Sequence, residues 1–420
     1  MLTINVFSEY LARHYPDFDD LAFRLSGEIA FRHSMIPERQ QRYHDWIQSH
    51  ENPESLSRGD SKAVRTLPRS PATSAEVAAS LDRARHGICD MEDFARLVSP
   101  AADEHLEAMA ELARDITRRR FGRTMQLYAP LYLSNECTSI CTYCGFSHDH
   151  DIKRLTLNAD SAEREADLLH AQGIRHILLL TGESYRHTPL SYLKEIIQRL
   201  SLKFPSISIE VYPLKESEYT ELRGVGLDGL TVYQETYDPE RYGRVHLRGM
   251  KKRMQFRLDC PDRGGRAGLR RIAVGALLGL SDPVADTFLA ALHARYLLKH
   301  YWQTQVGISL PRLRPAAEVN ALPLIPDRMY ARLLCALRIL LPDVALYLST
   351  REAPRMRDAF AGICITHMSA GSRTEPGGYS GQESTGQFEI EDVRPIPEIA
   401  HMLSEQSIEP VLVDWSPILK

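Results

Sequence analysis

The sequence lacks the features that mark secreted, membrane-spanning and nucleic-acid-binding proteins. Residues 1–20 do not place an apolar core behind a charged start, so we expect no signal peptide. The most apolar stretches, 272–280 and 288–298, are too short or too polar to cross a bilayer. The net charge is −4 with acidic and basic residues interspersed, so no basic surface for nucleic acid is expected. We therefore expect a cytoplasmic protein that binds neither membrane nor nucleic acid.

The sequence also lacks the even number of cysteines that a disulfide framework needs. The chain has 7 cysteines among 420 residues and no expected secretion signal, which argues against a disulfide framework. Three of them, Cys137, Cys141 and Cys144, fall in one short segment of the sequence. Such clustering indicates a chemical role for these thiols.

Residues 1–120 differ in composition and hydrophobic pattern from the rest and are predicted to form an N-terminal helical extension. Residues 58–75 are rich in Arg, Ser and Pro, which indicates a loop or linker around 50–75. A turn at Ser99-Pro100 should divide the last helical stretch in two. The predicted helices cover 2–25, 74–85 and 91–120.

From residue 125 onward, short apolar runs alternate with amphipathic segments. Strands rich in Ile, Val and Leu that alternate with helices predict right-handed βαβ crossovers and a parallel sheet. Their count and length match a (β/α)8 barrel over 121–372, followed by a C-terminal extension over 373–420; a doubly wound open sheet is the alternative. The predicted strands are 126–133, 176–181, 206–212, 229–234, 271–278, 305–311, 345–349 and 362–369, and the predicted helices are 159–172, 190–203, 217–225, 283–300 and 327–341.

The clustered cysteines follow the first predicted strand with the spacing Cys137-x3-Cys141-x2-Cys144. Thiolates are soft ligands that suit iron–sulfur clusters or zinc. A cubane cluster needs four ligands, so three local cysteines leave one iron open to a small molecule such as S-adenosylmethionine (SAM). Tyr143, directly before the third cysteine, suits the packing of an adenine ring.

The same cysteines allow a second interpretation. His148 and His150 follow closely, and zinc accepts three cysteines with one histidine. The compact spacing and the barrel pattern that follows favour the iron–sulfur cluster over zinc. The zinc alternative predicts an interaction protein without catalytic activity.

The cysteine segment and the strands after it resemble the radical SAM superfamily. Further segments extend the resemblance to the tyrosine lyase group, which includes ThiH, of thiamine biosynthesis, and HydG, of hydrogenase cofactor assembly. The resemblance implies a [4Fe–4S] cluster on the three cysteines, SAM as cofactor, a full barrel and a short extension associated with biotin and thiamine synthesis enzymes. It covers about residues 75–420 and rests, in order, on YLSNECTSICTYCGF, LLLTGE, VYQETY, CPDRGGRAGLRRIAVGALLGLSD, HYWQT, SLPRLRP, LSTRE and MSAGSRTEPGGY.

Several cofactor-binding residues follow from this resemblance. Gly182 and Glu183 end the second predicted strand and are similar to the family's contact with the SAM amino group. Gln234 and Glu235 end the fourth, where a carboxylate can accept hydrogen bonds from ribose hydroxyls. Arg263 precedes the fifth strand, and the resemblance groups it with these residues without giving it a contact. Without the resemblance, Gly182 and Glu183 indicate a strand-end turn, Glu235 indicates a solvated loop glutamate, and Arg263 indicates a structural ion pair.

Two residues are predicted to bind the substrate. Arg351 follows the seventh strand and Ser369 ends the eighth. A guanidinium binds a carboxylate through two parallel hydrogen bonds, and the resemblance places the substrate carboxylate at this arginine and serine. A surface salt bridge is the alternative for Arg351. Arg312 and Arg314, after the sixth strand, are further basic candidates near the same mouth.

The resemblance also implies the reaction. Hydrogen abstraction from the amino group of L-tyrosine is followed by cleavage of the Cα–Cβ bond, which gives 2-iminoacetate (dehydroglycine) and p-cresol. 2-Iminoacetate supplies the thiazole moiety of thiamine, so the implied partners are thiazole synthase (ThiG) and a flavodoxin or ferredoxin as electron donor.

The ending of the chain bears on the choice between relatives. HydG carries a second cluster on a cysteine-rich extension, whereas no cysteine follows Cys364 here and the ending with Asp414-Trp415 resembles ThiH. A HydG-like enzyme, or a radical SAM lyase of another aromatic amino acid such as tryptophan, is the alternative. Residues 26–73 depart from the usual ThiH pattern, and no function follows for them.

Overall fold

The computed structural model describes residues 72–319 and 325–413. The predicted helix over 2–25, most of the predicted linker around 50–75 and the Asp414-Trp415 ending lie outside these residues.

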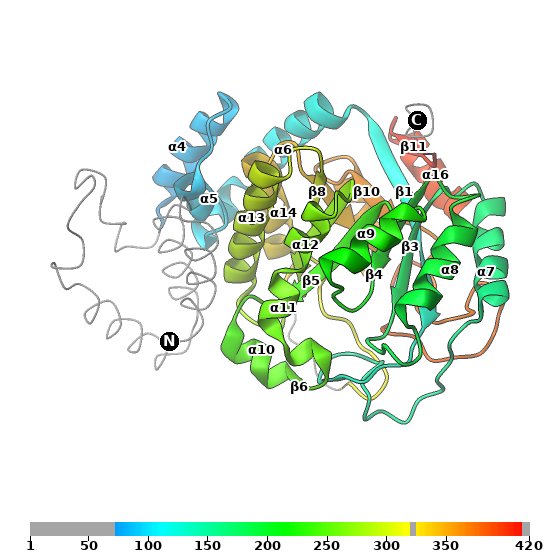
Figure 1. The fold of residues 1–420 in the computed structure, drawn as a ribbon. Coiled ribbons are helices and arrows are strands. Elements are labelled where there is room, and N and C mark those ends of the chain that lie inside the picture. Colours follow the sequence, from blue (N-terminus) through cyan, green and yellow to red (C-terminus); the bar gives the residue numbers. More distant parts are fainter. Residues whose placement is uncertain (1–71, 320–324, 414–420) are drawn as a thin grey trace.

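A closed barrel of parallel strands forms the centre of the molecule (Figure 1). The strands follow the order β10-β9-β8-β7-β5-β4-β3-β1, and β1 pairs with β10 to complete the ring. This closure, with Gln126 opposite His367, excludes the open sheet and confirms the predicted (β/α)8 barrel. The ring consists of β1 (Thr124–Ser134), β3 (His176–Thr181), β4 (Ser206–Glu210), β5 (Gly229–Glu235), β7 (Arg271–Ala276), β8 (Gln305–Ser309), β9 (Ala345–Leu348) and β10 (His367–Ser369).

Helices follow the strands and cover the outside of the barrel (Figure 1). The longest, α13 (Pro283–His300), begins where the Asp282 side chain accepts hydrogen bonds from the first-turn N–H groups of Val284 and Ala285. Among the described residues, no helix combines the length and apolar character needed to cross a membrane. The others on the barrel are α7 (Ala159–Ala171), α8 (Leu190–Leu200), α9 (Glu216–Gly224), α12 (Cys260–Arg266), α14 (Asp327–Leu340), α15 (Pro354–Ala361) and α16 (Ile396–Glu405).

An N-terminal helical layer packs against α13 and α14. Phe94 stacks on Phe288 of α13 with ring centroids 5.5 Å apart, so α13 is buried on its outer side as well as against the barrel. Arg332 of α14, almost fully buried, forms an ion pair with Asp103 at 2.5 Å. The layer comprises α4 (Ser74–Arg85), α5 (Met91–Leu97), the 3-10 helix η2 (Pro100–His105) and α6 (Leu106–Phe121), with the turn at Ser99-Pro100 where the sequence predicts it.

The barrel differs from the sequence prediction in its eighth strand, in the connection between β5 and β7, and in helices α12 and α15, which were not predicted. The eighth strand begins at His367, because Gly362 ends α15 and the chain turns before it enters the sheet. A whole excursion between β5 and β7 was not predicted, since each of its elements is too short to show a hydrophobic period. It contains α10 (Pro239–Val245), β6 (His246–Arg248), η3 (Met250–Lys252) and α11 (Met254–Leu258), and β6 pairs antiparallel with the two-residue strand β2 (Ile140–Cys141).

The C-terminal segment returns to the first barrel strand. Strand β11 (Glu409–Val411) pairs in parallel with the beginning of β1, next to the ring (Figure 1). A fully buried ion pair between Arg357 of α15 and Asp392 attaches the segment to the barrel. Arg357 also donates a hydrogen bond to the carbonyl of Ser369, so this ion pair supports the end of β10.

Candidate active site

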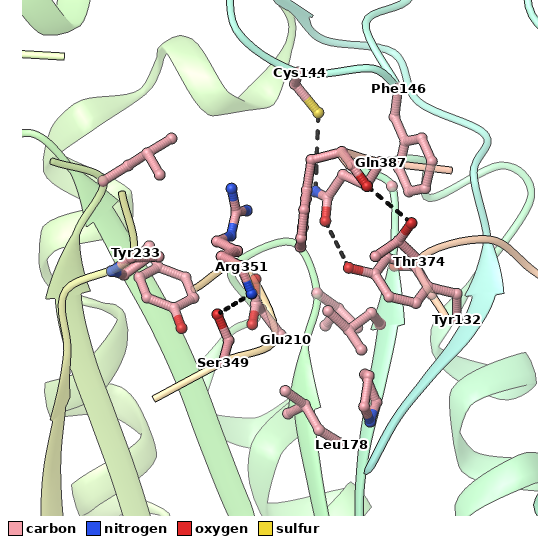
Figure 2. Close-up of a pocket in the computed structure, with 18 of the residues that line it drawn as sticks. Tyr132, Cys144, Phe146, Leu178, Glu210, Tyr233, Ser349, Arg351, Thr374 and Gln387 are labelled. Atoms are coloured by element: carbon pink, nitrogen blue, oxygen red, sulfur yellow. Dashed lines mark hydrogen bonds between the residues drawn. The ribbon is translucent and has the colours of Figure 1, made fainter. Parts of the chain in front are cut away.

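A pocket opens at the carboxyl ends of the barrel strands, where barrels carry their chemistry. It brings together most of the residues predicted from the sequence, including residues far apart in the chain (Figure 2). The predicted residues that line it are Cys137, Cys141, Cys144, Tyr143, Gly182, Glu183, Glu235, Arg351 and Ser369.

The three thiols lie in a buried setting with N–H donors aimed at sulfur. The backbone N–H of Ser139 donates to Cys137 Sγ at 3.4 Å, and Gln387 Nε2 donates to Cys144 Sγ at 3.8 Å. Burial raises the pKa of the Cys137 thiol to about 11 and also raises the pKa values of Cys141 and Cys144. Thiolates in such a place require a nearby positive charge, which metal ions supply, so the three residues fit an iron–sulfur cluster.

The alternative zinc site does not form. Within 72–319 and 325–413, no three His, Cys, Asp or Glu side chains converge where one metal ion could be held. His148, offered as a fourth zinc ligand, is exposed and places Nδ1 2.9 Å from the carbonyl of Cys137. A cubane cluster holds its thiolates on separate irons, so the three sulfurs need not converge on one point.

The excursion after β5 packs directly on the cysteine loop. Gly249 makes this possible: a Cβ there would lie 2.5 Å from Ser139 Cα, and its φ of 89° is in the left-handed region.

Tyr143 is held by the same excursion, since its OH and His246 Nε2 are 2.8 Å apart. Burial, together with nearby Lys251, lowers the pKa of His246 to about 3, so its neutral ring accepts the proton of Tyr143. The tyrosine is thereby fixed in the pocket wall, where it was predicted to pack on adenine.

Gly182 is required by the cysteine loop. A Cβ at this position would lie 2.3 Å from the carbonyl oxygen of Glu136 and 3.2 Å from Cys137 Cβ. The absence of a side chain therefore lets the end of β3 approach the cysteine segment, which differs from the predicted reason, an approach to the cofactor. Thr138 strengthens the same contact, because its N–H and hydroxyl both donate to the carbonyl of Glu183, at 3.0 and 2.8 Å.

A buried ionic network joins Glu183 to Glu235. Arg257 Nη1 lies 2.7 Å from Glu183 Oε1, and its Nη2 lies 3.6 Å from Glu235 Oε1. Lys251 Nζ reaches the same oxygen of Glu235 at 2.7 Å. Burial alone would raise the pKa of Glu235, but attraction to Lys251 and Arg257 outweighs it and lowers the pKa. Glu235 is therefore held as an anion, and both glutamates present carboxylate oxygens near the cysteines that can accept hydrogen bonds from ammonium or hydroxyl groups.

Glu235 also has a strained backbone. Its φ of 69° is unusual for a residue with a side chain, and the pairing of β5 with β7 shifts register between Tyr233 and Glu235. Tyr233 and Glu235 both line the pocket, whereas Gln234 between them does not. Gln234 is buried and faces away, since neighbours along a strand point to opposite sides. The prediction that Gln234 contacts the cofactor is corrected accordingly.

Arg351 and Ser369 line the same pocket. The Arg351 guanidinium stacks on Phe388 with Cζ 3.3 Å from the ring centroid, and no described residue forms an ion pair with it. Ser369 Oγ accepts a hydrogen bond from the N–H of Thr350 at 3.1 Å. The guanidinium is thus held flat on a ring with its donors available, which suits a planar carboxylate.

Arg263 lies elsewhere. Its Nε donates to the carbonyl of Leu214 at 2.7 Å, its Nη2 donates to that of Phe256 at 2.8 Å, and the guanidinium stacks on the Phe256 ring. The structure corrects the prediction, because Arg263 braces the loop before α9 and does not line the pocket. Arg312 and Arg314 do not line it either, since they are paired with Glu352 and Glu391.

Among the pocket residues that sequence reasoning missed, four are charged or donate a hydrogen bond to a cysteine sulfur. Gln387 lies between Cys144 and Tyr132 (Figure 2), and it accepts the Tyr132 hydroxyl proton at 2.8 Å. It belongs to the C-terminal extension, and no local pattern connects it with the cysteines. The other three of these four residues are Glu210 at the end of β4, Lys251 and Arg257. A carboxylate that ends a barrel strand was the one available signal, and it applied to Glu210.

The chain is similar to known proteins along most of its length. The radical SAM superfamily matches residues 131–288, and the biotin and thiamin synthesis associated domain matches residues 309–409. The chain is 42% identical to 2-iminoacetate synthase from Escherichia coli (strain K12), over 82% of this chain and 92% of that protein. It is 41% identical to 2-iminoacetate synthase from Salmonella typhimurium (strain LT2), over 81% of this chain and 91% of that protein.

Solved structures agree with this relationship. HydG, a maturase of the [FeFe]-hydrogenase, matches with a TM-score of 0.77 and 29% identity over 81% of this chain and 77% of that chain. The predicted cofactors, a [4Fe–4S] cluster and SAM, are those of the family. The cysteine loop, the closed barrel and the extent of the identity together place the chain in the 2-iminoacetate synthase family of radical SAM enzymes.

Proposed function

We propose that the enzyme cleaves the Cα–Cβ bond of L-tyrosine to 2-iminoacetate and p-cresol, and that 2-iminoacetate serves the thiazole moiety of thiamine. One observation carries the proposal beyond the family relationship. A single pocket holds three thiols fit for a cluster together with a guanidinium, Arg351, that forms no ion pair with a described residue. A radical enzyme acting on an amino acid needs both features within reach of each other.

The cofactor end is formed by the cysteines and the Glu183–Glu235 network. Cys137, Cys141 and Cys144 would hold the cluster, and SAM would occupy the space beside it. When bound, these groups supply a 5′-deoxyadenosyl radical that abstracts a hydrogen atom. Glu183 and Glu235, which form ion pairs with Arg257 and Lys251, are suited to accept hydrogen bonds from the ammonium and hydroxyl groups of the cofactor.

The substrate end is formed by Arg351, Ser369 and an apolar wall. Arg351 would bind the carboxylate of tyrosine through two hydrogen bonds, with the Ser369 hydroxyl beside it. Tyr132, Leu178 and Leu180 give the pocket apolar surface that fits an aromatic ring. Fixing the carboxylate keeps the amino group in one place, which is the positioning that hydrogen abstraction needs.

The C-terminal extension limits access of water to the reacting groups. Gln387 and Phe388 line the pocket, and the carbonyl of Gln387 accepts the N–H of Gly145 at 3.1 Å. This contact holds the extension on the cysteine loop. A covered pocket protects a reactive intermediate from side reactions.

The proposal is tested by anaerobic reconstitution with iron and sulfide, followed by incubation with SAM, L-tyrosine and a reductant. Mass spectrometry should detect 5′-deoxyadenosine, p-cresol and glyoxylate, the hydrolysis product of 2-iminoacetate, without cyanide. Parallel incubations with L-tryptophan and L-phenylalanine test substrate choice. 5′-Deoxyadenosine without p-cresol would overturn the tyrosine assignment, and cyanide would indicate HydG-like chemistry.

The partners and setting belong to the same proposal. A flavodoxin or ferredoxin would donate the electron, thiazole synthase (ThiG) would receive the product, and the enzyme would act in the cytoplasm. 2-Iminoacetate hydrolyses in water, which supports direct transfer to the next enzyme. Copurification with thiazole synthase, and turnover driven by reduced flavodoxin in place of a chemical reductant, would test the two partners.

A further inference from the structure

The charged residues of the pocket divide into two groups. Glu183, Glu235, Lys251 and Arg257 neutralise one another in the network beside the cysteines. Two further charged side chains line the same pocket, Arg351 and Glu210. Neither makes an ion pair or a side-chain hydrogen bond with any residue in the described ranges. The pocket therefore presents one cation and one anion without partners on the protein.

Glu210 occupies the last position of β4, at the edge where the strands open into the pocket. Figure 2 shows it below Arg351 in that view, and the positive charge of Arg351 acts on it. The side chains of Tyr128, Tyr132 and Tyr233 line the same part of the pocket. A carboxylate in such surroundings, without a donor from the protein, lacks the hydrogen bonds that buried polar groups normally have. It can acquire them from a ligand.

Charges from several elements act on Glu210. Burial raises its pKa to about 7, repulsion from Glu235 on β5 adds to the increase, and attraction to Arg351, Lys251 and Arg257 opposes it. The carboxyl group is therefore poised between its two protonation states near neutral pH. That is the condition in which a side chain accepts a proton from a substrate efficiently.

We propose that Glu210 binds the ammonium group of the amino acid substrate next to Arg351 and removes one proton from it. This inference rests on the proposed function and identifies the group that converts the substrate ammonium to a neutral amine before hydrogen abstraction. An N–H bond of the ammonium breaks, its electron pair stays on nitrogen, and an O–H bond forms on the Glu210 carboxylate. No electron is gained or lost in this step. The neutral amine keeps two N–H hydrogens, and one of them is available for abstraction.

The position of Glu210 favours the amine over the phenol of tyrosine. The carboxylate and ammonium groups of an α-amino acid are attached to the same carbon, so their binding sites must be neighbours. The phenolic hydroxyl lies at the opposite end of the substrate. Since Glu210 acts on the same part of the pocket as Arg351, the pair matches the two charges of the amino acid backbone.

The test compares the wild-type enzyme with Glu210→Gln, which keeps the size of the side chain but cannot accept the proton. At neutral pH, p-cresol formation by the variant should fall about 100-fold or more, in the range for loss of a general base. The Glu210→Asp variant should recover part of the activity. Glu107→Gln, on the exposed face of α6, provides the matched control and should behave as the wild type.

The pH profile distinguishes proton transfer from a structural role. Wild-type turnover should rise with pH to near pH 7, where Glu210 loses its proton, and then level off. The variant depends on amine already deprotonated in solution, so its turnover should rise about tenfold per pH unit across the same range. Parallel profiles for the two proteins would overturn the proposal.

Binding gives a second readout that does not need turnover. The wild-type protein should bind L-tyrosine more tightly than 3-(4-hydroxyphenyl)propanoate, which lacks the amine, and Glu210→Gln should lose this preference. If the variant instead loses the preference for L-tyrosine over L-phenylalanine, Glu210 contacts the phenol and the proposal is wrong. Failure of the wild type to form p-cresol would count against the proposed function itself, so the two failures are distinguishable.

Discussion

Replacing Arg351 by methionine should separate substrate binding from stability. The guanidinium stacks on Phe388 and forms no ion pair with a described residue, so its removal breaks no ion pair in the pocket wall. The loss of the cation–π contact should cost about 0.5–1 kcal/mol of unfolding free energy. Arg312→Met is the contrasting control, because it deprives the buried carboxylate of Glu352 of its partner and should cost about 3–5 kcal/mol.

The effect of Arg351→Met on substrate binding should be far larger. Two hydrogen bonds to a carboxylate contribute about 1.5–3 kcal/mol each, which gives about 3–6 kcal/mol together. Since 1.4 kcal/mol corresponds to tenfold, kcat/KM for L-tyrosine should fall by roughly 100-fold to 10,000-fold. Arg351→Lys should recover only part of this loss, because an ammonium cannot form the two parallel hydrogen bonds.

The assay measures p-cresol formation over a range of L-tyrosine concentrations, with urea unfolding of each variant in parallel. For Arg351→Met we expect a higher KM for L-tyrosine and a stability near that of the wild type. An unchanged KM, or a loss of stability as large as that of Arg312→Met, would refute the assignment of Arg351 to the substrate carboxylate.

Three further predictions concern the cluster, the extension and the pH dependence of stability. Cys144→Ser should abolish the brown absorbance of the reconstituted cluster, whereas Cys335→Ser, buried away from the pocket, should keep it. Asp392→Asn leaves Arg357 buried without its carboxylate and should lower the unfolding free energy by about 3–5 kcal/mol, measured by urea titration. The pKa of Glu210 is raised from its usual value of 4.5 to about 7 in the folded protein. Between these two pH values the folded protein holds a proton that the unfolded chain has released. The stability contributed by this group therefore falls as pH rises from 4.5 to about 7. Glu210→Gln should therefore be more stable than the wild type at about pH 8 and equal to it at about pH 4, and identical stability curves would contradict the raised pKa.

The residues that the sequence predicts well are those whose partners are close along the chain. The cysteine spacing is local. Strand β3 and helix α13 coincide with their apolar runs, because burial against the barrel requires apolar residues at those positions. Arg351 and Ser369 were predicted from the family resemblance, and their positions at the ends of predicted barrel strands fit the usual place of a barrel site. These predictions need no knowledge of side-chain packing.

The missed residues depend on contacts between distant segments. Gln387 approaches Cys144 from 243 residues away, and nothing in its own surroundings in the sequence indicates a thiol. Lys251 and Arg257 lie on an excursion whose position over the pocket depends on the pairing of β6 with β2. The error on Arg263 has the same origin, because the sequence cannot show that two backbone carbonyls already occupy its donors.

The return of the last segments to the first strand sets an order of events during synthesis. Strand β1 leaves the ribosome before the other strands of the ring, yet two of its three neighbours, β10 and β11, follow all the other barrel strands along the chain. The cysteines therefore emerge long before the barrel around them can close, and long-range pairing of this kind is slow. Until then the thiols are open to oxidation and to stray metal ions. Cluster loading on the finished chain, followed by the arrival of the segment around Gln387, would make the extension the last part of the site to be assembled.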